Sequence, residues 1–303
     1  MPHSHILNIR HLVDDLNLPE CDMLDYSDND PYQIVENFFQ FCQTDLSTPR
    51  EEYNILPALL YIRRSMEVNA AARKWNDYYI MRVNFGTLTT MFRIYTDRRT
   101  IFGSPELSDY KHLHDNLDAS LDYLLFQLSI QFTYYHEKGH LIQVSPVENN
   151  WIQESYAYEH PENDPFELPR HMYEFDADIF GSTMIGFHLL QYWKKQPDEL
   201  RTHENLNLLA SIGITSILSY FIFLLQKYVA MYYAASTHPH PLIRISYIVD
   251  NLVKTVEDNL EDNVLDRNAI MERVFAITDK LFTSSGDNWV TGLQRSFLKS
   301  EII

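Results

Sequence analysis

Cysteine is scarce in this sequence, because the 303 residues include only Cys21 and Cys42. Two cysteines cannot build the disulfide framework of a small secreted protein, and their spacing matches no metal-binding cysteine motif. Residues 1–12 also lack the apolar stretch that a secretory signal needs. These absences predict a protein of a reducing, cytoplasmic compartment.

Basic side chains and glycine are also few. The chain has 24 lysines and arginines against 42 aspartates and glutamates, for a net charge of -18, and it has only 8 glycines. Such acidity repels nucleic acids and anionic lipids, so neither is expected as a general partner, whereas a basic protein would be attracted. With 14% aromatic residues and no internal repeat, the composition predicts a largely helical globular protein.

One long segment lacks charge altogether. Residues 208–225 contain no charged side chain, and this length is sufficient for a membrane span. Hydroxyl side chains such as Ser211, Thr215 and Ser219 reduce its apolar character, and no basic cluster flanks it. We therefore predict a buried central helix, with membrane association as the alternative.

The clearest chemical motif is HExxH, formed by His136, Glu137 and His140. Apolar residues at mixed three and four spacing precede it, and neither proline nor glycine occurs between residues 117 and 138, so a helix is expected here. Two histidines four apart share one face of a helix and can bind zinc, while the adjacent glutamate can take a proton from water on the metal. Gly139, a poor helix former, indicates close packing. The alternative is a helix with two surface histidines.

A catalytic zinc ion needs a third protein ligand and keeps its fourth position for water. The sequence EFDAD at residues 174–178 begins a second apolar helical run. Glu174 and Asp178 lie four apart and share a helix face, whereas Asp176 points elsewhere. We assign Glu174 to the metal and Asp178 to the far ring nitrogen of a ligating histidine, whose tautomer it would fix. His171 is a rival ligand, and ordinary enrichment of acids in the first turn of a helix is the alternative explanation.

A third element spans residues 236–241, with the sequence STHPHP, and is followed by Arg244. Its prolines break a helix, so His238 is expected in a turn at a helix end. A histidine held there can donate to the oxyanion that forms when a peptide carbonyl is attacked. A lone histidine in a loop can equally be structural or face the solvent.

In this order, HEKGH, EFDAD and STHPHPLIR resemble the motifs of the gluzincin metallopeptidases, over residues 136–245. The resemblance implies one zinc ion per chain, bound by His136, His140 and Glu174, with Glu137 as general base. It further implies supporting roles for three other residues. Asp178 would orient a ligand, His238 would stabilise the oxyanion, and Arg244 would be a structural or substrate-orienting charge.

Within the gluzincins, the chain looks most similar to the phage-exclusion peptidase Lit family, although residues 1–115 match no family motif. That similarity implies a bacterial protease that cleaves elongation factor Tu after activation by a phage-derived peptide. The histidine-proline pair followed by Arg244 is also similar to the membrane-associated gluzincins of the HtpX and CAAX protease type, which is one alternative. A non-catalytic zinc-binding scaffold is the other.

The predicted architecture is an α+β fold, mainly helical and zincin-like, with a small antiparallel or mixed sheet before the HExxH helix. Residues 1–115 form a helical and small-sheet region, 116–245 the zinc peptidase core and 246–303 C-terminal helices, together one compact unit. Helices are expected at 31–46 and 50–75, and two or three strands between 78 and 102 with a turn at Gly86. The sheet edge could receive an extended substrate, and the insertion 144–170 is either a lid or a plain surface loop.

Overall fold

The computed structural model describes residues 13–14, 18, 22–25, 32–50, 53–97, 99–117, 119–143, 152–153, 168–224, 241–260 and 264–282. The helices of these residues are α2 (Tyr32–Leu46), α3 (Phe85–Asp97), α4 (Tyr110–Asn116), α5 (Leu121–Gln143), α6 (Leu168–Lys194), α7 (His203–Leu224), α8 (Pro241–Leu260) and α9 (Arg267–Phe282). The strands are β1 (Ala58–Arg63), β2 (Ala70–Trp75), β3 (Tyr78–Asn84) and β4 (Ile152–Gln153). The mainly helical α+β fold predicted from the sequence is therefore confirmed.

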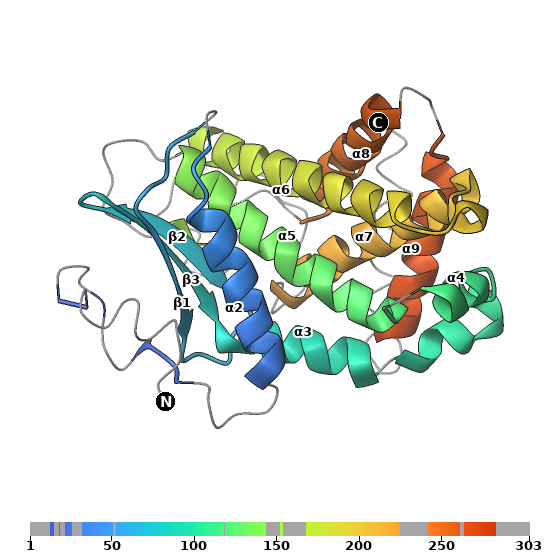
Figure 1. Cartoon of the computed structure of the whole chain (residues 1–303), viewed down its shortest axis with the longest axis horizontal. Helices are drawn as coiled ribbons and strands as arrows, with labels where there is room; N and C mark the ends of the chain where they lie inside the picture. Colours follow the sequence, from blue (N-terminus) through green and yellow to red (C-terminus); the bar gives the residue numbers. More distant parts are fainter. Residues whose placement is uncertain are drawn as a thin grey trace.

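The strands form one mixed sheet in the order β1-β3-β2-β4. β1 runs parallel to β3, with Leu60 opposite Met81, and β2 runs antiparallel to β3, with Ala72 opposite the same Met81. The short β4 pairs antiparallel with β2. Helix α2 packs against β1, and α5 packs against β2 and β3, on the same side of the sheet in Figure 1. Because β1, β2 and β3 precede α5, the small sheet lies before the HExxH helix, as predicted.

The helix predicted over residues 50–75 is wrong, because this segment forms β1 and β2. Both faces of β1 are covered. Leu60 and Ile62 belong to the main core, whereas Tyr61 packs with Leu18 and Met23 in a second cluster. A strand that is buried on both faces shows no alternation of apolar and polar residues, so its sequence resembles that of a buried helix.

The strand predicted around residues 91–95 is also wrong, because α3 begins directly after β3. Leu88, Met91 and Tyr95 are buried along one face of this helix at three and four spacing. The turn between strands predicted at Gly86 is also wrong, because Gly86 is the second residue of helix α3. A Cβ added at this position would collide with the carbonyl oxygen of Met66. The glycine therefore permits a close backbone contact.

Helix α5 is the central element of the fold. It packs against α6, α7, α3 and β2 and runs through the middle of the molecule beside α6 (Figure 1). Its buried residues extend from Leu121 to Leu141 on every side of the helix, which explains why its sequence is apolar all round. The HExxH motif, near the C-terminal end of α5, is consequently held by packing from several directions.

Helix α7 contains the uncharged run. Its segment His203–Ile222 is long and apolar enough to cross a membrane by length and composition, but its most apolar window is 100% buried inside the protein. A core helix and a membrane helix both pass this test. Polar groups of α7 are hydrogen-bonded within the core. The Ser211 hydroxyl shares a hydrogen bond with Tyr110, and the backbone carbonyl of Ser216 accepts one from Ser129 at 2.7 Å. The structure thus places residues 208–222 of this run in the interior, as in the predicted buried central helix.

Two further predictions lie only partly within the described residues. The helices expected after residue 245 are present as α8 and α9, and residues 283–303 lie outside the described part of the chain. Of the insertion 144–170, only β4 and the beginning of α6 are described, so neither the lid nor the surface-loop interpretation is tested.

Candidate metal centre

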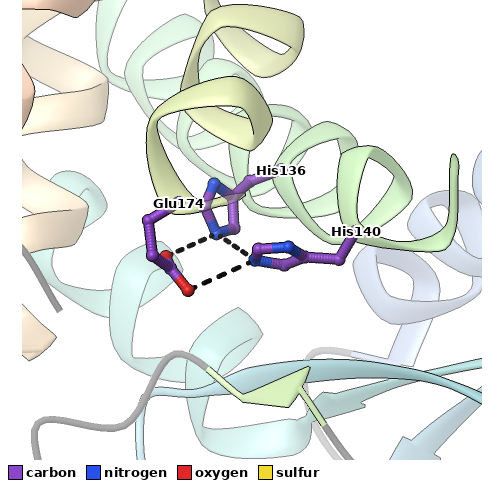
Figure 2. A group of neighbouring side chains, drawn as sticks. All are labelled: His136, His140 and Glu174. Atoms are coloured by element: carbon purple, nitrogen blue, oxygen red, sulfur yellow. Dashed lines mark hydrogen bonds and ion pairs between the residues drawn. The ribbon is translucent and has the colours of Figure 1, made fainter. Parts of the chain in front are cut away.

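The side chains of the HExxH motif and of Glu174 meet between α5 and α6. Figure 2 shows the imidazoles of His136 and His140 projecting from α5 toward the carboxylate of Glu174 on α6. The three side chains are at most 1% exposed. The four-residue spacing puts both histidines on one face of α5. The antiparallel approach of α6 then brings the glutamate to that face.

Small residues allow the two helices to approach this closely. A Cβ added at Gly139 on α5 would lie 3.0 Å from the Cα of Ala177 on α6. On the other helix, a Cβ added at Gly181 would lie 3.0 Å from the ring of Phe132. These positions flank the histidines and Glu174 along the interface. The glycine inside the motif therefore has the packing role that the sequence indicates.

The spacing of the donor atoms fits a tetrahedral ion. The two histidine Nε2 atoms are 3.1 Å apart. Glu174 places Oε2 at 3.5 Å from Nε2 of His136 and Oε1 at 3.6 Å from Nε2 of His140. Ligands bound at zinc-like distances of about 2.0–2.2 Å in tetrahedral geometry lie about 3.3 Å from one another. The buried group of His136, His140 and Glu174 could therefore bind a metal ion.

Asp178 lies at the far side of the His136 ring, with Oδ1 3.0 Å from Nδ1. Arg244 donates to this carboxylate from Nε and from Nη2, each at 2.7 Å. Burial alone raises the pKa of the Asp178 carboxyl, but the charge and hydrogen bonds of Arg244, together with His136, bring it below its ordinary value. An ionised Asp178 favours a proton on Nδ1 of His136, which leaves the lone pair of Nε2 facing His140 and Glu174.

Arg244 itself is completely buried, at the beginning of α8. Its guanidinium lies 4.3 Å from the ring centroid of Phe221 on α7, and Nη2 lies 3.6 Å from Oε2 of Glu174. Burial of a cation is costly unless charges and hydrogen bonds compensate it, and here Asp178, Glu174 and the aromatic face do so. Three helices, α6, α7 and α8, thus meet at the charged side of the metal centre.

The protonation state of His140 also suits a ligand. Burial lowers the pKa of this imidazole to about 4, and the charge of Glu174 only partly opposes that effect. At neutral pH the ring is therefore uncharged and offers a lone pair. An uncharged imidazole is the form that coordinates metal ions.

The other residues that the sequence singled out are Glu137, Asp176, His171 and His238. Glu137 is completely buried beside the two histidines, and Asp176 is exposed on another face of α6, as the spacing indicates. His171 is 1% exposed and lies one turn before Glu174. It does not belong to the three-residue ligand group found within the described residues. His238 lies outside the described residues, so its predicted role is not tested.

Two residues that contact the HExxH motif, Gln143 and Asp45, were not predicted from the sequence. Oε1 of Gln143 lies 3.0 Å from Nδ1 of His140, and Asp45 on α2 contacts the ammonium group of Lys138 inside the HExxH motif. Gln143 could have been found, because residues three apart on a helix are neighbours. Asp45 has no local signal, since 93 positions of the sequence separate it from Lys138.

The resemblance to gluzincins thus rests on the motif residues alone. Comparisons of the chain with protein-family models, with curated proteins and with solved structures found no match in any of the three.

Proposed function

We propose that this protein is a zinc-dependent endopeptidase of the gluzincin type. The observation that carries the proposal is the arrangement of His136, His140 and Glu174, whose donor atoms lie 3.1 to 3.6 Å apart in a buried site next to Glu137. Two imidazoles and one carboxylate are a donor set of catalytic zinc, whereas magnesium and calcium prefer oxygen ligands alone. Three protein ligands leave one tetrahedral position for water.

The bound metal would supply Lewis acidity, strongly lowering the pKa of a bound water, toward about 7, and polarising the scissile carbonyl. The carboxylate of Glu137 would accept a proton from the attacking water and deliver it to the leaving amine. Asp178 and Arg244 would hold the His136 ring in its ligating tautomer. His238 would donate a hydrogen bond to the carbonyl oxygen as negative charge develops there.

The substrate and setting follow from the resemblance to the Lit family. Elongation factor Tu is the protein to test first, with a phage-derived peptide as activator, in the cytoplasm. The net charge of -18 supports a partner with a basic surface over a nucleic acid.

The test of the proposal compares the wild type with Glu137→Gln, which is nearly isosteric and leaves the three ligands in place. Both proteins are incubated with bacterial extract containing elongation factor Tu, with and without phage-infected lysate, and newly formed N-termini are identified by mass spectrometry. We expect Glu137→Gln to bind zinc as the wild type does and to cleave about 100- to 10,000-fold more slowly. Equal cleavage by both proteins would refute the role of Glu137.

A structural zinc site in a scaffold protein is the competing function. Such a site is closed by a fourth protein ligand, so that no water binds the metal. The three-residue group among the described residues favours an open site. Replacing zinc with cobalt and adding a small thiol or hydroxamate distinguishes the two, because an open site changes its visible absorption spectrum and a closed site does not.

A further inference from the structure

Gln143, the last residue of α5, links the His140 ring to helix α6. Its Oε1 lies 3.0 Å from Nδ1 of His140. Its Nε2 donates to the backbone carbonyl of Tyr173 at 2.9 Å. Tyr173 immediately precedes Glu174 in the sequence, so one half-buried side chain is in contact with one ligand and with the backbone next to another.

These two contacts determine where the proton of His140 lies. A carbonyl oxygen only accepts hydrogen bonds, so the Gln143 group that faces Tyr173 must be the amide nitrogen. The amide oxygen then faces His140, and Nδ1 must carry the proton that it accepts. The remaining nitrogen, Nε2, therefore presents its lone pair to His136 and Glu174.

The two histidines of the motif are thus oriented in different ways. His136 has the ionised carboxylate of Asp178 at its far nitrogen, at 3.0 Å, whereas His140 has a neutral amide at the same distance. With both Nδ1 atoms protonated, the Nε2 lone pairs of both histidines point toward the Glu174 carboxylate. Fixing the tautomer of His140 therefore gives the second histidine the form that binds a metal ion.

We propose that Gln143 is a positioning residue of the metal centre, which sets the tautomer of His140 through its amide oxygen. The inference rests on the metal site of the proposed function but does not require that the protein hydrolyse peptides. It predicts that the acceptor at position 143 matters for metal affinity and that the donor to Tyr173 matters less.

The experiment uses the full-length protein and three variants. Gln143→Met removes both polar contacts at similar volume, and Gln143→Glu keeps an acceptor for His140 but loses the donor to Tyr173. Gln127→Met is the matched control, because Gln127 is also half-buried on α5 but lies far from the ligands. Zinc affinity is measured by competition with a chromophoric chelator. The tautomer of His140 in metal-free protein is read from its ring 15N chemical shifts, and thermal unfolding of the metal-free variants checks the fold.

We expect Gln143→Met to bind zinc about 10- to 100-fold more weakly than the wild type. Its His140 should show a mixed tautomer, while Gln143→Glu and Gln127→Met should stay within about threefold of the wild type. A Gln143→Met protein with wild-type affinity would overturn the proposal. So would a Gln143→Glu protein as weak as Gln143→Met, because that result assigns the effect to the bridge with Tyr173. Zinc affinity is measured without substrate, so a wild type that binds zinc but cleaves nothing contradicts the peptidase proposal alone.

Discussion

Arg244 and Asp178 form a two-point contact in the interior, with Nε and Nη2 of the guanidinium each 2.7 Å from a different carboxylate oxygen. Neither residue is accessible to solvent. The contact joins α8 to α6, and through Asp178 it reaches His136 on α5. The orientation of a candidate metal ligand therefore depends on a helix that contributes none of the three candidate ligands.

Removal of Arg244 should destabilise the protein strongly. Arg244→Gln leaves the Asp178 carboxylate buried without its cation, and breaking a buried pair from one side costs about 3–5 kcal/mol of unfolding free energy. Urea unfolding of metal-free protein measures the loss. The double variant Asp178→Asn with Arg244→Gln should recover part of it, because no unpaired charge remains. A single variant within 1 kcal/mol of the wild type would contradict the prediction.

The half-buried Asp45 and the buried Lys138 form a second ion pair, which should couple α2 to the HExxH helix. Lys138 is 1% exposed, and its ammonium contacts Asp45, which also accepts a hydrogen bond from Tyr134 at 2.6 Å. Asp45→Asn should cost about 3 kcal/mol of unfolding free energy, because it leaves a buried ammonium unpaired. Adding Lys138→Met should restore about 1–2 kcal/mol of it. Strictly additive losses in this double-mutant cycle would argue against the coupling.

Because of this ion pair, the unfolding free energy of the protein should fall in acid. Burial alone raises the pKa of Asp45, but hydrogen bonds from Lys138 and Tyr134 outweigh it and bring the pKa below its ordinary value. Below about pH 4, the unfolded chain therefore binds a proton at Asp45 more readily than the folded chain does. The stability from this group is complete above that pH and is lost as pH falls through the folded pKa.

The measurement is the difference in unfolding free energy between wild type and Asp45→Asn, without metal, from about pH 6 to pH 2.5. Asparagine resembles a protonated aspartate, so the difference should shrink toward zero at the acid end. A difference that stays constant across this range would mean that Asp45 does not titrate with a lowered pKa.

Local spacing was sufficient to find the three side chains of the candidate metal centre. His136 and His140 repeat at the period of one helix, and Glu174 and Asp178 repeat at the same period on another, so each helix presents its pair on one face. What spacing could not give is the approach of α6 and α8 to α5. That approach depends on close packing at Gly139 and on a charge pair between residues 66 positions apart, Asp178 and Arg244.

The errors in the fold have a related cause. Ala70, Ala71 and Ala72 are good helix formers, yet all three are fully or almost fully buried in β2, where neighbouring strands and α5 cover them. Tertiary burial there overrides local preference, and it does so again in α3, where Met91 and Tyr95 face the core. The candidate ligands follow a helical period that can be read from the sequence, because residues four apart share one helix face, whereas strands buried on both faces need no particular period.

Gly139→Ala should test whether the close approach of α5 and α6 sets the ligand spacing. In an isolated helix, alanine would be favoured over glycine by about 1 kcal/mol. Here its Cβ would lie 3.0 Å from the Cα of Ala177, which is backbone and cannot rotate away. Overpacking of this kind costs about 1–3 kcal/mol, so we expect a net loss of unfolding free energy of about 1 kcal/mol.

The more specific expectation for Gly139→Ala concerns metal binding. Separating the helices at Ala177 moves Glu174 away from His140, whose donor atoms are now 3.6 Å apart, so zinc affinity should fall beyond what the loss of stability explains. Gly103→Ala is the matched control, because a Cβ there meets nothing within 4 Å. Chelator competition and urea unfolding of both variants separate affinity from stability. If Gly139→Ala were more stable than the wild type and bound zinc equally well, the helix contact would not determine the geometry of the site.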